Sequence, residues 1–380
     1  MSLSHRCWAE IDLEALRNNL VWLRHHIGPN SGIMTVVKAD AYGHGLRQIA
    51  TLLMQSGTDI FGVANLNEAR DIRAVGRGWP ILMLGACLPD EIERAVKDNV
   101  MPTLSSISEA RHFSRVAKKL NRTVTAHIKV DTGMGRLGAP SSEAPQLIES
   151  ISNLPNITIA GLYTHYASAE SNAPLSRTQR TSFHKVLTKL KAAGRSFEYI
   201  HMNNSAGLLH ERKSNHNLAR PGLLVYGVIP TGPRRPPAIM KRHIQPALSW
   251  KCRVSLVKSI AKGTKLSYGQ TYTAKRTMRV ATLTAGYGDG YLYSVQREAR
   301  VLIGGRLCPI LGRITMDQMI VDVSRVKNAK TGDEVVLIGK QGKYNITANQ
   351  LAKWANTIPC EILTAIAYRV PRVYRGGQAA

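Results

Sequence analysis

Long apolar stretches, paired cysteines and acidic residues are all scarce in this sequence. No uncharged stretch approaches the ~18 residues needed to cross a membrane, and charged residues among the first twelve leave no room for the apolar core of a signal peptide. The five cysteines lie far apart and form no C-x-x-C pair, which argues against a metal site or a disulfide framework. We therefore predict a cytoplasmic protein with reduced thiols, no metal and no membrane partner.

The scarcity of acidic residues leaves the chain strongly basic. It has 25 Asp and Glu against 51 Lys and Arg, a formal net charge of +26. Such an excess can indicate a nucleic-acid partner, but that function needs basic residues that cluster. Here they are scattered from Arg6 to Arg375, with no long basic run and no interleaved aromatic stripe. We therefore predict no nucleic-acid partner, and salt-sensitive gel retardation would test this alternative.

The length and the pattern of the chain predict two domains. A chain of 380 residues is longer than one typical domain. In its first part, short β-branched runs alternate with helical patterns such as residues 13–27, where apolar side chains recur every three or four positions. Alternating strands and helices imply parallel strands. We therefore predict an α/β fold with a (β/α)8 TIM-type barrel over residues 10–235. The runs are 33–37, 60–63, 81–84, 124–130, 157–162 and 223–225, with further helices at 91–97, 108–120 and 179–193.

A proline-rich segment marks the predicted boundary of the barrel. Residues 231–237 contain three prolines, which can continue neither a helix nor a central strand. Beyond them, short strands separated by glycine-rich turns predict a mainly β domain over residues 241–380, joined by residues 1–9, with one helix near 347–356. The expected strands are 247–260, 278–283, 300–303, 319–323 and 334–338.

Lys38 directly follows the predicted strand 33–37 and enters a predicted loop that extends to Gly45. A lysine at the mouth of a barrel strand can form a Schiff base once its surroundings lower its pKa. Residues 36–45, VVKADAYGHG, closely resemble the pyridoxal phosphate signature of alanine racemases. Further segments resemble the family in order and spacing along nearly the whole chain. They are 129–138, 164–167, 203–205, 219–222, 267–272, 286–291, 312–318 and 368–372.

The resemblance implies a set of residues that bind pyridoxal 5'-phosphate. Lys38 would carry the cofactor, His165 would lie against its ring, and Arg220 would donate to its pyridine nitrogen. Without the resemblance, residues 203–205 are typical of a turn or helix cap, and Arg220 could form a surface ion pair. Hydroxyl, amide and backbone donors would bind the phosphate. They come from Tyr42, Asn204, Ser205, Gly222, Leu223 and Tyr368.

The resemblance also implies a two-base racemisation of alanine. Lys38 and Tyr268 would stand on opposite faces of the aldimine and exchange the α-hydrogen of D- and L-alanine, respectively, which would supply D-alanine for peptidoglycan. In the family the tyrosine comes from a second subunit, so we expect a homodimer with shared active sites. By itself, Tyr268 is typical of a hairpin turn with an exposed ring. The family pattern links His165 to both Arg220 and Tyr268, and a nearby fixed positive charge favours the phenolate.

Substrate binding is implied for Arg136, whose planar fork suits a carboxylate, and for the backbone N–H of Met316. Lys129 matches a lysine that relatives carry as a carbamate, although an ordinary strand lysine is the alternative. The chain departs from the family where Leu292 and Tyr293 replace the usual proline and arginine of the substrate-channel motif, and where Glu170 replaces an aspartate. These changes leave open how strictly the site selects alanine.

Three alternatives remain beside an alanine racemase. A broader amino-acid racemase, for serine among others, would share the catalytic pair and differ only in the shape of the pocket. A non-catalytic pyridoxal phosphate carrier resembles the barrel but lacks a second domain. A decarboxylase of the same architecture would carry a cysteine-containing substrate motif, and neither Cys308 nor Cys360 has suitable neighbours.

Overall fold

The computed structural model describes residues 5–210, 216–295 and 298–376. They form two compact units, each assembled from segments that are distant in the sequence. Residues 17–41 and 45–245 make one unit, here called the barrel unit. The chain up to residue 16, residues 42–44 and the chain from residue 246 onward make the other, here called the β unit. Among the described residues, no helix is both long and apolar enough to span a bilayer.

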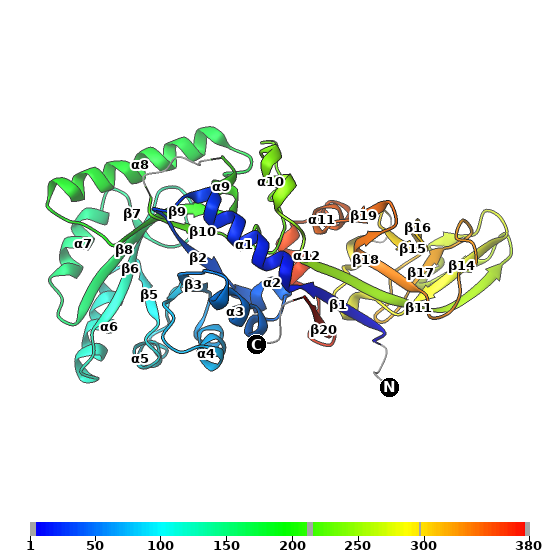
Figure 1. The fold of residues 1–380 in the computed structure, drawn as a ribbon, viewed down its shortest axis with the longest axis horizontal. Helices are drawn as coiled ribbons and strands as arrows, with labels where there is room; N and C mark the ends of the chain where they lie inside the picture. The colour runs from blue at the N-terminus through cyan, green and yellow to red at the C-terminus, as the bar shows by residue number, and fades with distance from the viewer. Residues whose placement is uncertain (1–4, 211–215, 296–297, 377–380) are drawn as a thin grey trace. The chain divides into compact units, whose positions relative to one another are not determined.

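The barrel unit is a closed ring of parallel strands, so the predicted TIM-type barrel is confirmed. Pairing of β5 with β6 closes the sheet, and helices lie outside the strands that they connect (Figure 1). The ring strands are β2 (Gly32–Val36), β3 (Ile60–Val63), β4 (Ile81–Met83), β5 (Met101–Leu104), β6 (Val124–Asp131), β8 (Ile157–Tyr163), β9 (Tyr199–Asn204) and β10 (Leu218–Arg220), with β7 (Ala139–Pro140) beside β6.

The helices of this part of the chain follow from local sequence signals. Helix α1 occupies the predicted residues because its apolar positions recur at helical spacing. Helix α6 begins with a capping box in which Ser106 and Glu109 bond each other's backbone N–H groups. The helices are α1 (Leu13–Ile27), α2 (Lys38–Gly43), α3 (Leu46–Gln55), α4 (Leu66–Val75), α5 (Ile92–Lys97), α6 (Ile107–Lys119), α7 (Ala144–Ser152), α8 (Ala173–Ala192), α9 (Ser205–His210) and α10 (Ala238–His243).

One predicted barrel strand is wrong. Residues 223–225 lie in a turn, and the final strand is β10, five residues earlier. Leu224 and Val225 are fully buried, so their apolar character reflects packing rather than an extended backbone. A short apolar run cannot distinguish these two possibilities.

The β unit contains a second closed arrangement, of antiparallel strands. Strand β11 pairs with both β14 and β18, and β15, β16 and β17 complete the ring. Strand β1 pairs with β11 and with β20, so both ends of the chain contribute to this sheet. The strands are β1 (Cys7–Asp12), β11 (Leu248–Ile260), β12 (Lys265–Leu266), β13 (Tyr272–Thr273), β14 (Met278–Leu283), β15 (Arg300–Ile303), β16 (Arg306–Leu311), β17 (Met319–Asp322), β18 (Glu334–Gln341), β19 (Tyr344–Ile346) and β20 (Arg372–Arg375).

The mainly β character predicted for this part is confirmed. The predicted helix is α11 (Ala348–Ala355), but a second helix, α12 (Pro359–Thr364), was not predicted. Six residues are too few to give a clear helical period in the sequence.

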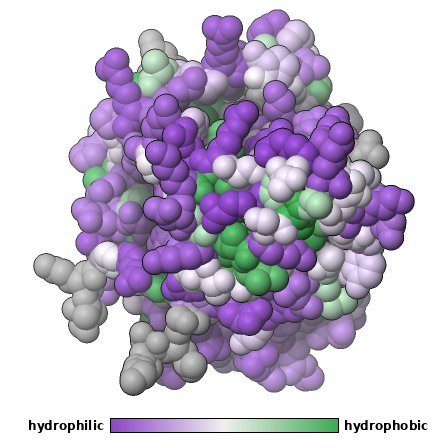
Figure 2. Space-filling model, turned by 90° about the vertical axis from the view of Figure 1, so that its right-hand side faces the viewer, coloured by the Kyte–Doolittle hydropathy of each residue, from purple (hydrophilic) through white to green (hydrophobic). Residues whose placement is uncertain are grey.

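Figure 2 views the molecule from the side at which Figure 1 labels β14 to β17. Hydrophilic side chains cover most of this face, and apolar ones gather in a limited area.

Candidate active site

Lys38 lies two residues after the end of strand β2, but it begins a left-handed helical turn, so the predicted loop is wrong. The next four residues have φ between 52° and 53°, a conformation that costs L-residues about 1–2 kcal/mol each. The Ala39 N–H donates to Glu68 Oε1 (2.7 Å), and the Ala41 N–H donates to the Val37 carbonyl (2.9 Å). These bonds hold the turn and leave Lys38 half-buried at the end of the strand. Strain of this kind concentrates at functional sites.

Four basic side chains predicted for the site each lower the pKa of one imidazole of the barrel unit, that of His165. Burial is the main reason why the pKa of His165 lies well below its ordinary value, and Arg220, Lys129, Arg136 and Lys38 lower it further. None of the four forms an ion pair within the part of the chain that the structure describes. Lys129 and Arg220 are buried, and because buried charges are normally paired, this concentration of positive charge favours an anionic ligand.

Arg220 ends strand β10 and is held by neutral acceptors. Its Nη2 donates to the Thr164 carbonyl (2.9 Å) and contacts His165 Nδ1 (3.2 Å), while Nη1 lies 2.8 Å from His201 Nδ1. A second carbonyl, that of Met202, accepts from Nη2 at 3.2 Å. The side chain is 2% exposed, so a surface ion pair is wrong for this residue. Burial lowers the pKa of Arg220 to about 10, which keeps it protonated at neutral pH.

Four of the predicted phosphate donors, Asn204, Ser205, Gly222 and Leu223, lie around the start of helix α9. Ser205 Oγ accepts the N–H groups of Gly222 (2.9 Å) and Leu224 (3.3 Å), so its own proton remains to donate. The Leu223 N–H makes no hydrogen bond within the described residues. Asn204 Oδ1 accepts from the Gly207 N–H (2.8 Å), which makes it a helix cap, and its amide nitrogen lies 3.3 Å from His165 Nε2.

Three further predicted residues lie in the β unit with exposed side chains. Tyr268 is 72% exposed in the hairpin between β12 and β13, Met316 is 53% exposed and Tyr368 is fully exposed. Ser267 has a φ of 64°, and its hydroxyl donates to the Arg313 carbonyl (2.6 Å), which fixes the hairpin beside Tyr268. Tyr42 lies half-buried on the left-handed turn.

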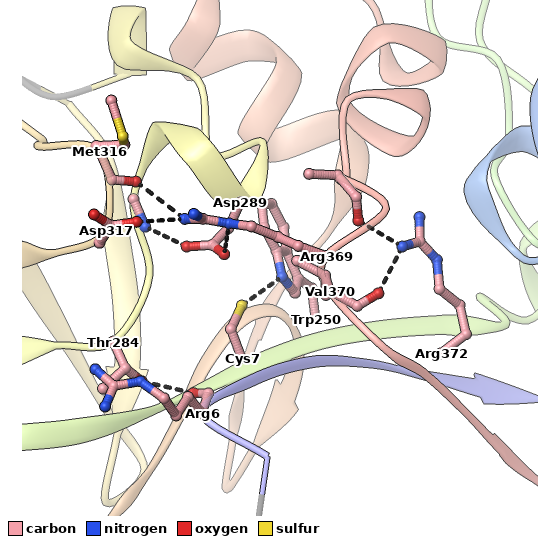
Figure 3. A network of polar contacts seen from close by, with 12 residues as sticks. Arg6, Cys7, Trp250, Thr284, Asp289, Met316, Asp317, Arg369, Val370 and Arg372 are labelled. Atoms are coloured by element: carbon pink, nitrogen blue, oxygen red, sulfur yellow. Dashed lines mark hydrogen bonds and ion pairs between the residues drawn. The ribbon is translucent and has the colours of Figure 1, made fainter.

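A salt-bridge network stabilises the loops that carry Met316 and Tyr368 (Figure 3). The Arg369 guanidinium donates to Asp289 Oδ1 and to Asp317 Oδ1, both at 2.8 Å, and it contacts the Met316 carbonyl at 3.4 Å. Asp289 Oδ2 also accepts the Gly286 N–H (2.9 Å). The network therefore joins the motif at residues 286–293, for which the resemblance implies a substrate channel, to the Met316 loop and the segment after Tyr368 inside one unit.

The substrate-channel motif departs from the family at Tyr293, and the structure shows what this side chain contacts. Its ring lies edge to face against Tyr287, with centroids 6.2 Å apart. The other position that departs from the family is Glu170 in the barrel unit, and its backbone carbonyl accepts from the Arg234 N–H (3.2 Å). An aromatic pair thus stands where the family pattern has an arginine, which makes this part of the motif less charged.

Sequence reasoning missed three buried side chains beneath the cation cluster. The rings of Tyr163 and His201 stack with centroids 4.6 Å apart, and the Arg220 Cζ lies 5.1 Å from the centre of the Tyr163 ring. His127 Nδ1 lies 2.9 Å from His201 Nε2. One signal was available, because His127 and Lys129 are two residues apart on a strand and therefore share a face. No pattern marks the other two.

A closed (β/α)8 barrel with a lysine after its first ring strand, and unpaired cations beside an imidazole, defines a class of protein. It is the class of barrel enzymes that hold a small phosphorylated cofactor on a lysine. The comparisons with known proteins agree. Models of the N-terminal and C-terminal domains of alanine racemase match residues 11–230 and 247–374.

Whole-length relatives carry the same name. The alanine racemase of Halothermothrix orenii is 40% identical over 369 residues, which cover 97% of this chain and 96% of that protein. The structure of alanine racemase from Streptomyces lavendulae has a TM-score of 0.92 and 32% identity, covering 99% of both chains. That from Bartonella henselae, with covalently bound pyridoxal phosphate, has a TM-score of 0.88 and 29% identity, covering 98% of this chain and 100% of that one. The chain belongs to the alanine racemase family.

Proposed function

We propose that this chain is a pyridoxal phosphate-dependent alanine racemase, an isomerase that interconverts L- and D-alanine and supplies D-alanine for peptidoglycan. The observation that carries the proposal is the unpaired cation cluster at the barrel end, in a chain that matches this family over nearly its whole length. The test is to incubate the enzyme with each standard L-amino acid and to monitor racemisation by circular dichroism. Alanine should react fastest. A faster reaction with serine would indicate the broader racemase, and cofactor absorbance without any racemisation would indicate the carrier.

The residues present fit pyridoxal phosphate. Lys38 would hold the cofactor covalently, and the Ser205 hydroxyl with the N–H of Leu223 would bind its phosphate. The Gly222 N–H, which donates to Ser205 Oγ in this structure, would join them by sharing its hydrogen with the phosphate. Arg220 Nε makes no hydrogen bond within the described residues, so it remains available to the pyridine nitrogen. When bound, this cofactor withdraws electrons from the α-carbon of the attached amino acid and makes its hydrogen acidic. Asn204, Tyr42 and Tyr368 would complete the set through their amide and hydroxyl groups.

Arg220 would determine how strongly the cofactor withdraws electrons. An arginine can only donate a hydrogen bond, because it keeps its proton. Arg220 would therefore leave the pyridine nitrogen of a bound cofactor unprotonated, which would limit electron withdrawal and disfavour side reactions such as transamination. His165 stays neutral because burial and the surrounding cations lower its pKa.

Two proton-transfer groups would act on opposite faces of the substrate. Racemisation removes a proton from one face of the α-carbon and delivers one to the other, so a single group on one side is insufficient. The Lys38 amine would exchange the α-proton of D-alanine, and the Tyr268 hydroxyl that of L-alanine. Arg136 would bind the substrate carboxylate through its fork. The Met316 N–H would assist, since it makes no hydrogen bond among the described residues.

A homodimer with shared sites is supported by the exposure of the β unit's predicted residues. Tyr268, Met316 and Tyr368 are large side chains that are exposed in the single chain, so a second subunit could contact them. In such a dimer each Tyr268 would complete the site of the partner subunit. We place the enzyme in the cytoplasm, where D-alanine is needed for precursor synthesis, with amino acids as its small-molecule partners.

The surroundings of Lys129 support its modification to a carbamate. It is 3% exposed, and burial together with Arg136 lowers the pKa of its ammonium to about 8. A lowered pKa leaves part of the side chain as a neutral amine, which can attack carbon dioxide; the new C–N bond forms a carbamate and one proton is released. The carbamate anion would pair with Arg136 and orient it. These observations support the carbamate over an ordinary strand lysine.

The effect of Lys129→Met on the free energy of unfolding distinguishes the two states. For a carbamate, the substitution removes an anion beside Arg136, and the free energy of unfolding falls by about 1–3 kcal/mol in bicarbonate buffer at pH 7. For a free ammonium, it removes a buried cation and the free energy rises. That gain would disappear between pH 8 and 10.5, because there the native state binds fewer protons than the unfolded state.

Chemical denaturation of both proteins measures this difference. Lys258→Met, an exposed strand lysine, is the matched control and should change the free energy of unfolding by less than about 0.5 kcal/mol. Two results together would contradict the carbamate: a Lys129→Met variant that is more stable than the wild type at pH 7, and an intact mass of the wild-type protein that lacks the added carboxylate group.

A further inference from the structure

Behind Arg220 lies a chain of two histidines that none of the assigned roles uses. His127 on β6 and His201 on β9 are fully buried. His127 Nδ1 lies 2.9 Å from His201 Nε2, and His201 Nδ1 lies 2.8 Å from Arg220 Nη1. The two imidazoles and the guanidinium thus form one continuous line of hydrogen bonds across the inside of the barrel.

The backbone is arranged to bring His127 to this position. The pairing of β6 with β8 shifts register between Ala126 and His127, a bulge that changes the direction of a side chain. Gly161 faces it on β8, and a Cβ there would lie 2.3 Å from His127 Nδ1. A glycine in the interior of a strand weakens the strand and marks a close approach. The His127 ring also stacks on Tyr199, with centroids 5.6 Å apart.

Arg220 dictates where the protons of both imidazoles lie. A guanidinium N–H only donates, so His201 Nδ1 must accept and the proton of a neutral His201 must be on Nε2. That proton then donates to His127 Nδ1, and the proton of His127 must be on Nε2, a buried atom with no hydrogen-bond partner among the described residues. Burial and Arg220 lower the pKa of His127 to about 3 and that of His201 well below its ordinary value, so both rings are neutral at pH 7.

We propose that His127 is a positioning residue: by accepting the Nε2 proton of His201, it keeps the Nδ1 lone pair of His201 toward Arg220 and so aims the guanidinium at the cofactor ring. Without an acceptor at position 127, His201 has two arrangements. It can keep a buried N–H unsatisfied, or move the proton to Nδ1, where it faces the Arg220 N–H groups. Each weakens the bond between His201 and Arg220, because an unsatisfied buried donor is costly.

The inference concerns the protein's own protons, and only its effect on the cofactor rests on the proposed function. The first test is long-range proton–nitrogen NMR of the protein labelled with 15N-histidine, recorded with and without pyridoxal phosphate. His201 should show an unprotonated Nδ1 and a protonated Nε2 in both samples. A proton on His201 Nδ1 in the wild type would overturn the proposal without any variant. Absence of cofactor binding would instead contradict the proposed function and leave this result intact.

Two variants separate hydrogen bonding from packing. In His127→Asn, Oδ1 is as many bonds from the backbone as Nδ1 is in histidine and can accept the same proton, whereas His127→Leu offers no acceptor. We expect His127→Leu to shift the visible absorption of the bound cofactor, to alter the His201 nitrogen signals, and to lower kcat for alanine about tenfold. His127→Asn should restore all three toward wild type.

Controls keep these outcomes decisive. His25→Leu replaces an exposed histidine of α1 and should leave the absorption and the rate unchanged. Thermal unfolding shows whether each variant is folded; if His127→Leu is not, the wild-type nitrogen signals and His127→Asn decide. Unchanged His201 signals in a folded His127→Leu, or an equal defect in His127→Asn, would show that His127 only fills space and would overturn the proposal.

Discussion

Replacement of Lys38 by alanine should abolish racemisation, with a loss of at least about 10⁴-fold in kcat. Two functions disappear together, since the amine both holds the cofactor and exchanges one α-proton. The left-handed turn that presents Lys38 is bonded through the backbone and through Glu68, so the fold should survive. Chiral chromatography of alanine measures the rate, and circular dichroism checks the fold.

Mass spectrometry shows whether Lys38 is the attachment point. After borohydride reduction, the peptide that carries Lys38 should gain the mass of the cofactor in the wild type, and no peptide should in Lys38→Ala. Lys118→Ala, an exposed helix lysine of the same unit, is the matched control and should keep full activity. Label on another lysine, or substantial racemisation by Lys38→Ala, would contradict the assignment.

Tyr268→Phe should lower racemisation about 10³-fold, within the range that one positioned acid–base group supplies. The two enantiomers have equal free energies, so any variant loses the same factor of kcat/KM in both directions. Rates therefore cannot show which face Tyr268 serves, but hydrogen exchange can. In deuterated water, Tyr268→Phe should still exchange the α-hydrogen of D-alanine through Lys38 while exchange of L-alanine is lost.

The hairpin offers a close control for this experiment. Tyr272 lies four residues further along, and among the described residues its hydroxyl makes only a long contact with Met278 Sδ (3.6 Å), so Tyr272→Phe should behave as wild type. NMR of recovered alanine measures the exchange. Preferential exchange of L-alanine by Tyr268→Phe would reverse the two assignments, and unimpaired racemisation would remove Tyr268 from the mechanism.

Elements with a strong local period could be predicted from the sequence. Helix α1 and strands β3, β14 and β15 occupy the predicted residues, because their apolar positions repeat along their own segments. The turn after Lys38 could not be predicted, because four consecutive left-handed residues other than glycine contradict local preference. Their stability depends on contacts such as the bond from Ala39 to Glu68, 29 residues away.

The candidate site also contains residues that the sequence could identify and residues that only the folded structure reveals. Lys38, Arg136 and Arg220 belong to contiguous motifs, and the resemblance to the family identifies them without a structure. His127 and His201 belong to no motif, and their role arises from a hydrogen bond between residues 74 positions apart. The cation cluster likewise depends on the ring of strands that brings Lys129 on β6 and Arg220 on β10 to one region.

Subunit mixing tests the central claim, that an amine and a phenol from two subunits act on one carbon atom. Differently tagged Lys38→Ala and Tyr268→Phe chains would be co-expressed and the heterodimer isolated by both tags. One of its two sites should then hold an intact Lys38 and an intact Tyr268, so the heterodimer should regain about half of the wild-type rate, against a near-zero rate for each mutant homodimer. A verified heterodimer that stays as inactive as the parent homodimers would contradict the shared site.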